Sequence, residues 1–90
     1  MACLKFFGRF RSYVASREVS ITAATVRQAL DELLPSNRDL QGAMLDNGVL
    51  RAYVRILVNG RDIELAQGLD TSLGPDDEVA IFSPMAGGQD

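Results

Sequence analysis

A single strong amphipathic helix signal, over residues 25–34, most constrains the fold of this chain. Its apolar residues recur at the i, i+3, i+4, i+7 and i+8 spacing of one helix stripe: Val26, Ala29, Leu30, Leu33 and Leu34. Thr25 and Gln28 have the spacing of a capping box, and Pro35 ends the segment. One such helix covers only one face of a small sheet, so the sequence predicts a sheet with its second face open.

Five short segments show the alternation or composition that is typical of strands. They are residues 2–7, 17–22, 54–58, 61–65 and 78–82. Phe10 and Tyr13, between the first two segments, are expected to cap the edge of the core. Within residues 35–53, Leu40, Met44 and Leu45 are expected to lie on a short helical turn under the sheet, and Asn59-Gly60 favours a type I′ hairpin turn.

The order strand, strand, helix, strand, strand, strand is that of a β-grasp if the last strand pairs in parallel with the first. The expected fold class is therefore α+β, ubiquitin-like, with a mixed sheet of about five strands and one main helix packed on one face. Ninety residues suit one domain. We expect the β-grasp domain at residues 1–82 and a flexible C-terminal tail at residues 83–90.

Composition excludes several kinds of active site. The chain has no histidine and one cysteine, which excludes Cys-His and Ser-His-Asp sites, histidine-based metal sites and an intramolecular disulfide. A ferredoxin-type cluster needs about four cysteines. We therefore expect neither an enzyme nor a bound metal or cofactor, and a redox or nucleophilic role for Cys3 lacks the base it would need.

The charge pattern bears on partners and location. Net charge is −3, and every ionisable residue after Arg61 is acidic, which argues against a nucleic-acid surface and suits a basic protein partner; a solvated acidic face explains the charge as well. The sequence contains neither an apolar run of membrane-spanning length nor a signal-peptide pattern. The expectation is a cytoplasmic protein without membrane contact.

The tail holds the one candidate chemical site. Ser83-Pro84 biases the backbone to an extended path, and Gly87-Gly88 then offers backbone without side chains. Such an end suits a narrow channel in which an enzyme activates a terminal carboxylate. A frayed terminus is the plain alternative, because a glycine pair is a weak signal by itself.

Taken together, four segments resemble the sulfur-carrier branch of the ubiquitin-like proteins, the MoaD/ThiS family. They are residues 5–11, 24–26, 56–62 and 76–88, and the resemblance covers essentially the whole chain. It implies that the carboxylate of Gly88 is adenylated with ATP by a ubiquitin-activating-like enzyme and then converted to a thiocarboxylate. A tail of this kind is recognised through the residues before Gly88, namely Pro84, Met85, Ala86 and Gly87.

The resemblance also raises the question of processing. Gln89-Asp90 follow Gly88, so the Gly88 carboxyl is held in a peptide bond. Some family members depend on a JAMM-like metalloprotease to remove such an extension, and we expect cleavage between Gly88 and Gln89. The sulfur acceptor would be a biosynthetic enzyme, and molybdopterin, thiamin, cysteine, tRNA thiolation or a secondary metabolite are open as its pathway.

Strand alternation suggests where partners bind. It places Phe82 opposite the inward Val79 and Ile81, so Phe7, Leu57 and Phe82 are expected to form an exposed apolar patch for partner docking. Two other functions stay open. The chain could be a protein modifier that is conjugated to lysines through Gly88, or a non-catalytic β-grasp interaction module whose tail is incidental.

Overall fold

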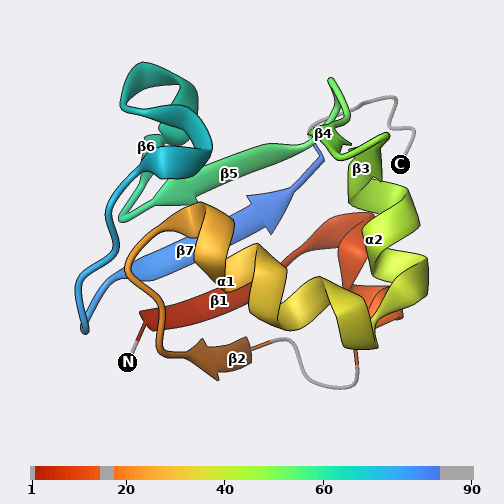
Figure 1. The fold of residues 1–90 in the computed structure, drawn as a ribbon, viewed down its shortest axis with the longest axis horizontal. Coiled ribbons are helices and arrows are strands. Elements are labelled where there is room, and N and C mark those ends of the chain that lie inside the picture. Colours follow the sequence, from red (N-terminus) through yellow and green to blue (C-terminus); the bar gives the residue numbers. More distant parts are fainter. Residues whose placement is uncertain (1, 15–17, 84–90) are drawn as a thin grey trace.

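The strands nearest the two ends of the chain lie side by side at the centre of one sheet (Figure 1). The computed structural model describes residues 2–14 and 18–83. β1 (Ala2–Phe6) pairs in parallel with β7 (Glu78–Phe82), and the remaining pairings in the five-stranded sheet are antiparallel, in the order β2-β1-β7-β5-β6. A parallel pair needs a long crossover, which here contains the main helix. The predicted β-grasp is confirmed.

The other elements follow in chain order. The sheet is completed by β2 (Glu18–Ile21), β5 (Arg55–Val58) and β6 (Arg61–Asp62), and a separate hairpin is formed by β3 (Leu45–Asp46) and β4 (Val49–Leu50). The α-helices are α1 (Val26–Leu33) and α2 (Arg38–Met44). Short 3-10 helices are η1 (Gly8–Tyr13), η2 (Leu34–Ser36), η3 (Ile63–Leu65) and η4 (Gly68–Asp70). No helix in the described ranges is long and apolar enough to cross a membrane.

α1 begins and ends where the sequence predicts. The Thr25 hydroxyl accepts a hydrogen bond from the Gln28 N–H at 3.1 Å, which satisfies one free donor of the first turn. The Gln28 side chain accepts from the Ala24 N–H at 2.9 Å, one residue before the position that a reciprocal capping box would use. Pro35 lies in η2, directly after the helix. The predicted apolar stripe is buried throughout.

The core lies between α1 and one face of the sheet (Figure 1). Leu4 and Phe6 of β1, with Val79 and Ile81 of β7, are at most 1% exposed. Burying a side chain of this size contributes about 1.5–3 kcal/mol, so these central strands hold much of the stability. α2 adds Leu40 and Met44 to the same core.

Three details differ from the sequence-based expectation. The 35–53 segment, expected as a short helical turn, contains η2, the seven-residue helix α2 and the β3–β4 hairpin. The segment 61–65 is not all strand, since β6 ends at Asp62 and η3 follows, with the Asp62 carboxylate accepting from the Glu64 N–H at 2.9 Å. This bend places Ile63 in the core. Of the two aromatic residues expected to cap the core, Phe10 is fully buried in η1, whereas Tyr13 is 39% exposed.

Candidate functional site

The open face of the sheet brings the three predicted docking residues together. Ile56 and Ile81 face each other on the core side of the β5–β7 pair, so their chain neighbours point to the opposite face. On that face Leu57 lies across from Ala80, and Phe82 is the next residue of β7 that points to the same side. The Phe7 N–H donates to the Ile81 carbonyl at 3.0 Å. We call Phe7, Leu57, Ala80 and Phe82 the open-face patch.

The open-face patch is only partly covered by the described residues. Phe7 is 44% exposed, and Leu57, Ala80 and Phe82 are half-buried. Exposed apolar groups that adjoin one another mark candidate interaction surfaces. The geometry therefore agrees with the expected patch, and its role in docking stays a prediction.

Charged side chains border this patch, and the sequence-based prediction missed them. Lys5, opposite Ala80, lies 3.4 Å from a Glu78 carboxylate oxygen. Arg55, opposite Phe82, lies 3.8 Å from Glu64. Surface pairs of this kind stabilise a fold by about 0–1 kcal/mol, and here they place charges of both signs at the border of the patch. Strand alternation over residues 5 and 55 was the signal that could have identified them.

A basic side chain lies opposite the end of β7, and two further arginines are held by contacts with other segments. Arg55 lies opposite the last residue of β7. The Arg9 guanidinium lies 5.0 Å from the ring centroid of Tyr53, and the Arg51 Nε donates to the Gly42 carbonyl at 3.0 Å. Of these three arginines, Arg55 is the one that strand pairing places beside the last residue of β7.

The tail residues themselves fall largely outside the described part of the chain. Ser83 is the last residue described, and its hydroxyl oxygen is buried without a hydrogen-bond partner. The predicted recognition, activation and cleavage positions lie beyond it: Pro84, Met85, Ala86, Gly87, Gly88 and Gln89. What the structure fixes is the point of departure, at the carboxyl end of a central strand.

Cys3 lies on the open face as well, but its environment favours the thiol. Its Sγ donates to the Glu18 carboxylate at 3.8 Å. Burial raises the pKa of this thiol above its ordinary value, and the negative charge of Glu18 raises it further. In the described part of the chain, no group of three or more acidic, cysteine or histidine side chains is placed to hold a metal ion.

Comparison with known protein families and chains gives a consistent result. The ThiS family model matches residues 4–88. The chain is 33% identical over 88 residues to small archaeal modifier protein 3 of Haloferax volcanii. That alignment covers 94% of this chain and 96% of the relative. It is 35% identical over 72 residues to a candidate sulfur carrier protein of Archaeoglobus fulgidus. This second alignment covers 79% of this chain and 82% of that protein.

A solved structure agrees in fold over nearly the whole length. The solution structure of small archaeal modifier protein 1 from Methanosarcina acetivorans superposes with a TM-score of 0.87 at 25% sequence identity. The superposition covers 94% of this chain and 93% of that one. Similarity in sequence and in fold therefore extends across the described body of the molecule.

Proposed function

Because the chain belongs to the ThiS family and is similar to a candidate sulfur carrier protein, we propose that it carries sulfur as a thiocarboxylate on Gly88. The observation that carries the proposal is the extent of the family match, which runs through the glycine pair and stops at residue 88. The part of the chain that the family shares thus ends on the residue whose carboxyl would react. Gln89 and Asp90 lie outside that match.

Both chemical steps, adenylation and sulfur transfer, would take place in partner enzymes. An oxygen of the free Gly88 carboxylate attacks the α-phosphorus of ATP, and pyrophosphate leaves. Hydrosulfide then attacks the acyl carbon of the adenylate, AMP leaves with the former carboxylate oxygen, and a thiocarboxylate results. Glycine at both of the last two positions places no Cβ in the channel through which the tail reaches ATP. The carrier contributes the tail and the surface by which partners recognise it.

Activation first requires hydrolysis of the Gly88–Gln89 bond. The Ser83-Pro84 sequence, which favours an extended backbone, and the glycines after it suit a protease cleft that binds backbone. We propose a JAMM-like metalloprotease for this step. Intact mass spectrometry of the full chain in a host extract tests it, and sulfur transfer from a chain that keeps Gln89-Asp90 would refute it.

We assign the open-face patch to docking of the ubiquitin-activating-like enzyme. Phe7 and Phe82 lie at the carboxyl end of the central strands, next to the departure point of the tail. A partner that covers the patch would therefore hold the tail root in a fixed position, which favours its entry into an activation channel. The same geometry serves a later sulfur-accepting enzyme.

A second candidate function is protein modification. The relatives named small archaeal modifier proteins are as similar to this chain as the candidate sulfur carrier is. A modifier uses the same adenylate, but a lysine amine displaces AMP and an isopeptide bond results. High-molecular-weight conjugates that resist thiols, detected in the host with an antibody to this chain, would favour modification.

ATP–pyrophosphate exchange tests the first step of either function. A chain that ends at Gly88 should stimulate exchange by the activating enzyme, because its carboxylate is free to react. The 90-residue chain, and a chain that ends at Gly87, should not. Exchange that is equal for all three would refute Gly88 as the activated residue.

A further inference from the structure

The chain contains two Asn-Gly turns of the same geometry, and they differ in how firmly the asparagine is held. Asn47-Gly48 joins β3 to β4, and Asn59-Gly60 joins β5 to β6. The residues of both turns have positive φ, between +52° and +85°, as a two-residue type I′ loop requires. Both asparagines are exposed, so access of water does not distinguish them.

Asn59 is held on three sides by hydrogen bonds to the neighbouring strand. Its side-chain amide donates to the Asp77 carboxylate at 2.9 Å, and its side-chain oxygen accepts from the Glu78 N–H at 3.0 Å. Its own backbone N–H donates to the Glu78 carbonyl at 2.8 Å. The Asn59 side chain can therefore change its position only after bonds to two different residues break.

The Asn47 side chain, by contrast, has no hydrogen-bond partner among the described residues. The base of its hairpin is held, since the Arg51 N–H donates to the Met44 carbonyl at 2.8 Å. Beyond the base, two residue pairs join β3 to β4, and Val49, directly after the turn, is 66% exposed. The tip of this hairpin can therefore open while its base stays in place.

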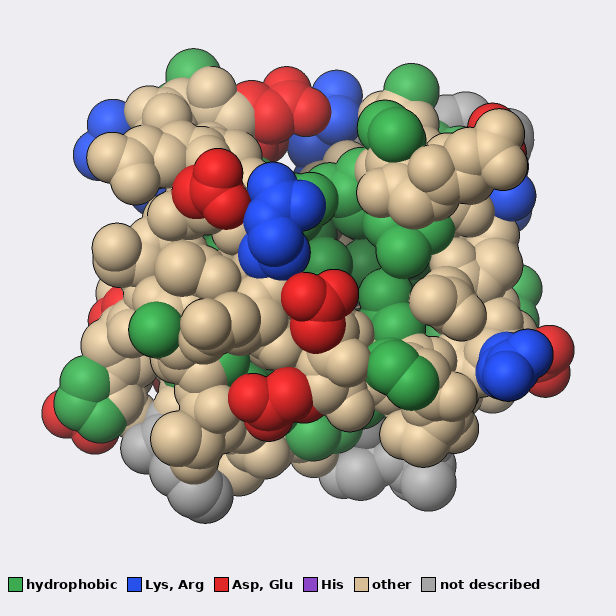
Figure 2. All heavy atoms as spheres, viewed as in Figure 1, with side chains coloured by type: hydrophobic (Ala, Val, Ile, Leu, Met, Phe, Trp, Pro, Cys, Tyr) green, Lys and Arg blue, Asp and Glu red, His purple; other side chains and the backbone are tan. Residues whose placement is uncertain are grey.

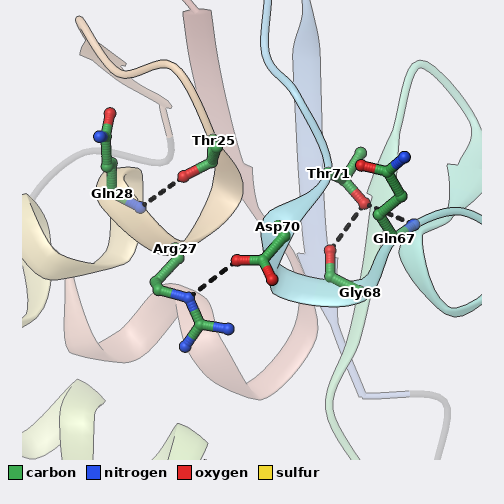
Figure 3. Close-up of polar contacts among 7 residues, drawn as sticks. All are labelled: Thr25, Arg27, Gln28, Gln67, Gly68, Asp70 and Thr71. Atoms are coloured by element: carbon green, nitrogen blue, oxygen red, sulfur yellow. Dashed lines mark hydrogen bonds and ion pairs between the residues drawn. The ribbon is translucent and has the colours of Figure 1, made fainter.

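Unfilled space adjoins the same tip. Cavities of about 110 Å³ and about 340 Å³ are both lined by Gly48, and Figure 2 shows a hollow with apolar side chains on this face. The wall opposite the hairpin is fixed, because the Arg27 Nε lies 3.1 Å from an Asp70 carboxylate oxygen and the Thr71 hydroxyl donates to the Gly68 carbonyl (Figure 3). These contacts join α1 to η4 and do not involve the turn. Sparse packing of this kind lowers the cost of local opening.

We propose that Asn47 is a site of spontaneous modification, at which the side-chain amide is lost as ammonia. The Gly48 backbone nitrogen bonds to the Asn47 Cγ, the bond from Cγ to Nδ2 breaks, and the proton lost by the backbone nitrogen is balanced by the one that the leaving amide gains. A cyclic succinimide remains. Water then adds to either imide carbonyl, and ring opening gives aspartate or isoaspartate. Glycine favours the first step, because no Cβ hinders the attacking nitrogen.

The modification would change the hairpin in two ways. Either product adds a negative charge next to the exposed Asp46. The isoaspartyl product also adds a carbon atom to the main chain of a two-residue loop, which no longer matches the register of β3 and β4. Neither the tail nor the open-face patch takes part, so the proposal does not depend on sulfur carriage.

Peptide mass spectrometry of the full 90-residue chain tests the proposal. Cleavage after arginine places Asn47 in the peptide 39–51 and Asn59 in the peptide 56–61, so each turn is measured separately. When the folded chain is incubated in mild alkali, the first peptide should gain the mass difference between an amide NH₂ and OH, in two products that chromatography separates. The second peptide should react at least about tenfold more slowly, because its hydrogen bonds must break first.

A substitution at Asp77 isolates the effect of hydrogen bonding. Asp77→Ala removes the acceptor of the Asn59 amide and should speed the loss of that amide at least about threefold. The rate at Asn47 in the same molecule should stay unchanged, which checks that the fold is intact. Asp76→Ala, at the neighbouring exposed position, is the matched control and should change neither rate.

The urea-unfolded chain provides the reference rate for both peptides. There the two should react at similar rates, because both contain Asn-Gly. Three results would each overturn the proposal: equal rates in the folded chain, no reaction at Asn47 in a time that suffices for the unfolded chain, or no effect of Asp77→Ala on Asn59.

Discussion

The carboxylate of Asp77 ties together the turns at one end of β5 and β7. It accepts from the Gly74 N–H at 2.7 Å and from the Asn59 side-chain amide at 2.9 Å. Asn59 in turn accepts from the Glu78 N–H at 3.0 Å. These hydrogen bonds to the charged form hold the pKa of Asp77 below its usual value. The bond from the Gly74 N–H has the larger effect, and the bond from Asn59 the smaller one.

This network predicts a specific loss of stability in acid. A carboxyl with a lowered folded-state pKa stabilises the fold fully above its unfolded pKa of 3.8, and the effect is lost as pH falls through the lower folded pKa. Asp77→Asn should therefore unfold at lower urea than the parent at pH 6, with the difference shrinking below pH 4 (about the ordinary aspartate pKa). Asp76→Asn, outside the network, is the control, and an unchanged difference across this pH range would contradict the assignment.

Two glycines should respond to alanine in opposite directions. Gly60 has φ of +85° in the turn after β5, a conformation that strains any residue with a Cβ, so Gly60→Ala should destabilise by about 1 kcal/mol. Gly42 lies inside α2 with open space around an added Cβ, so Gly42→Ala should stabilise by about 1 kcal/mol. Urea unfolding measures both, and shifts of the same sign would contradict the backbone geometry.

At the scale of elements, the α1 cap is the clearest local determinant. Thr25→Ala removes the acceptor of the Gln28 N–H and should cost about 1 kcal/mol of folding stability. Thr25→Ser keeps a hydroxyl at the same place and should retain most of it. Urea denaturation separates the two variants, and an equal loss in both would mean that the methyl group, rather than the hydroxyl, is what matters.

Elements whose determinants are local were predictable from the sequence. The cap and stripe of α1 and the glycine turn at 59–60 each depend on a few neighbouring residues, and each was confirmed. The bend at Asp62 has a local part, the hydrogen bond from the Glu64 N–H to the Asp62 carboxylate, and a part that the sequence does not show, burial of Ile63 against residues distant in the chain. The cavity between α1, the β3–β4 hairpin and η4 was not predictable either, since it depends on how these separate segments pack.

The candidate site likewise contains residues that local sequence pattern predicts and residues that only the fold brings together. Alternation in β5 and β7 was enough to place Leu57 and Phe82 on one face, because side-chain direction in a strand has a period of two. Arg55 at the end of β7 was not foreseen, since its place opposite Phe82 depends on the antiparallel register of β5 and β7. The distribution of charge along the sequence does not show which basic residue lies at the end of β7.

At the scale of the whole molecule, a carrier needs a body that tolerates changes at its docking face. Phe82 is half-buried on the open face, away from the core, so Phe82→Asp should stay folded and weaken binding to the activating enzyme at least about tenfold. Val49→Asp, on the opposite face, is the matched control and should bind normally. Circular dichroism checks the fold and isothermal titration calorimetry the affinity, and unchanged binding by Phe82→Asp would remove the open-face patch from docking.

The most direct test of the central claim is the intact mass of a chain that ends at Gly88. It is incubated with the activating enzyme, ATP and a sulfur donor. The account predicts a mass gain equal to exchange of one oxygen for sulfur, located at Gly88 by fragmentation, and none in a chain that ends at Gly87. An unchanged mass with an enzyme that sulfurates its own known carrier, or sulfur found on Cys3 instead, would contradict it.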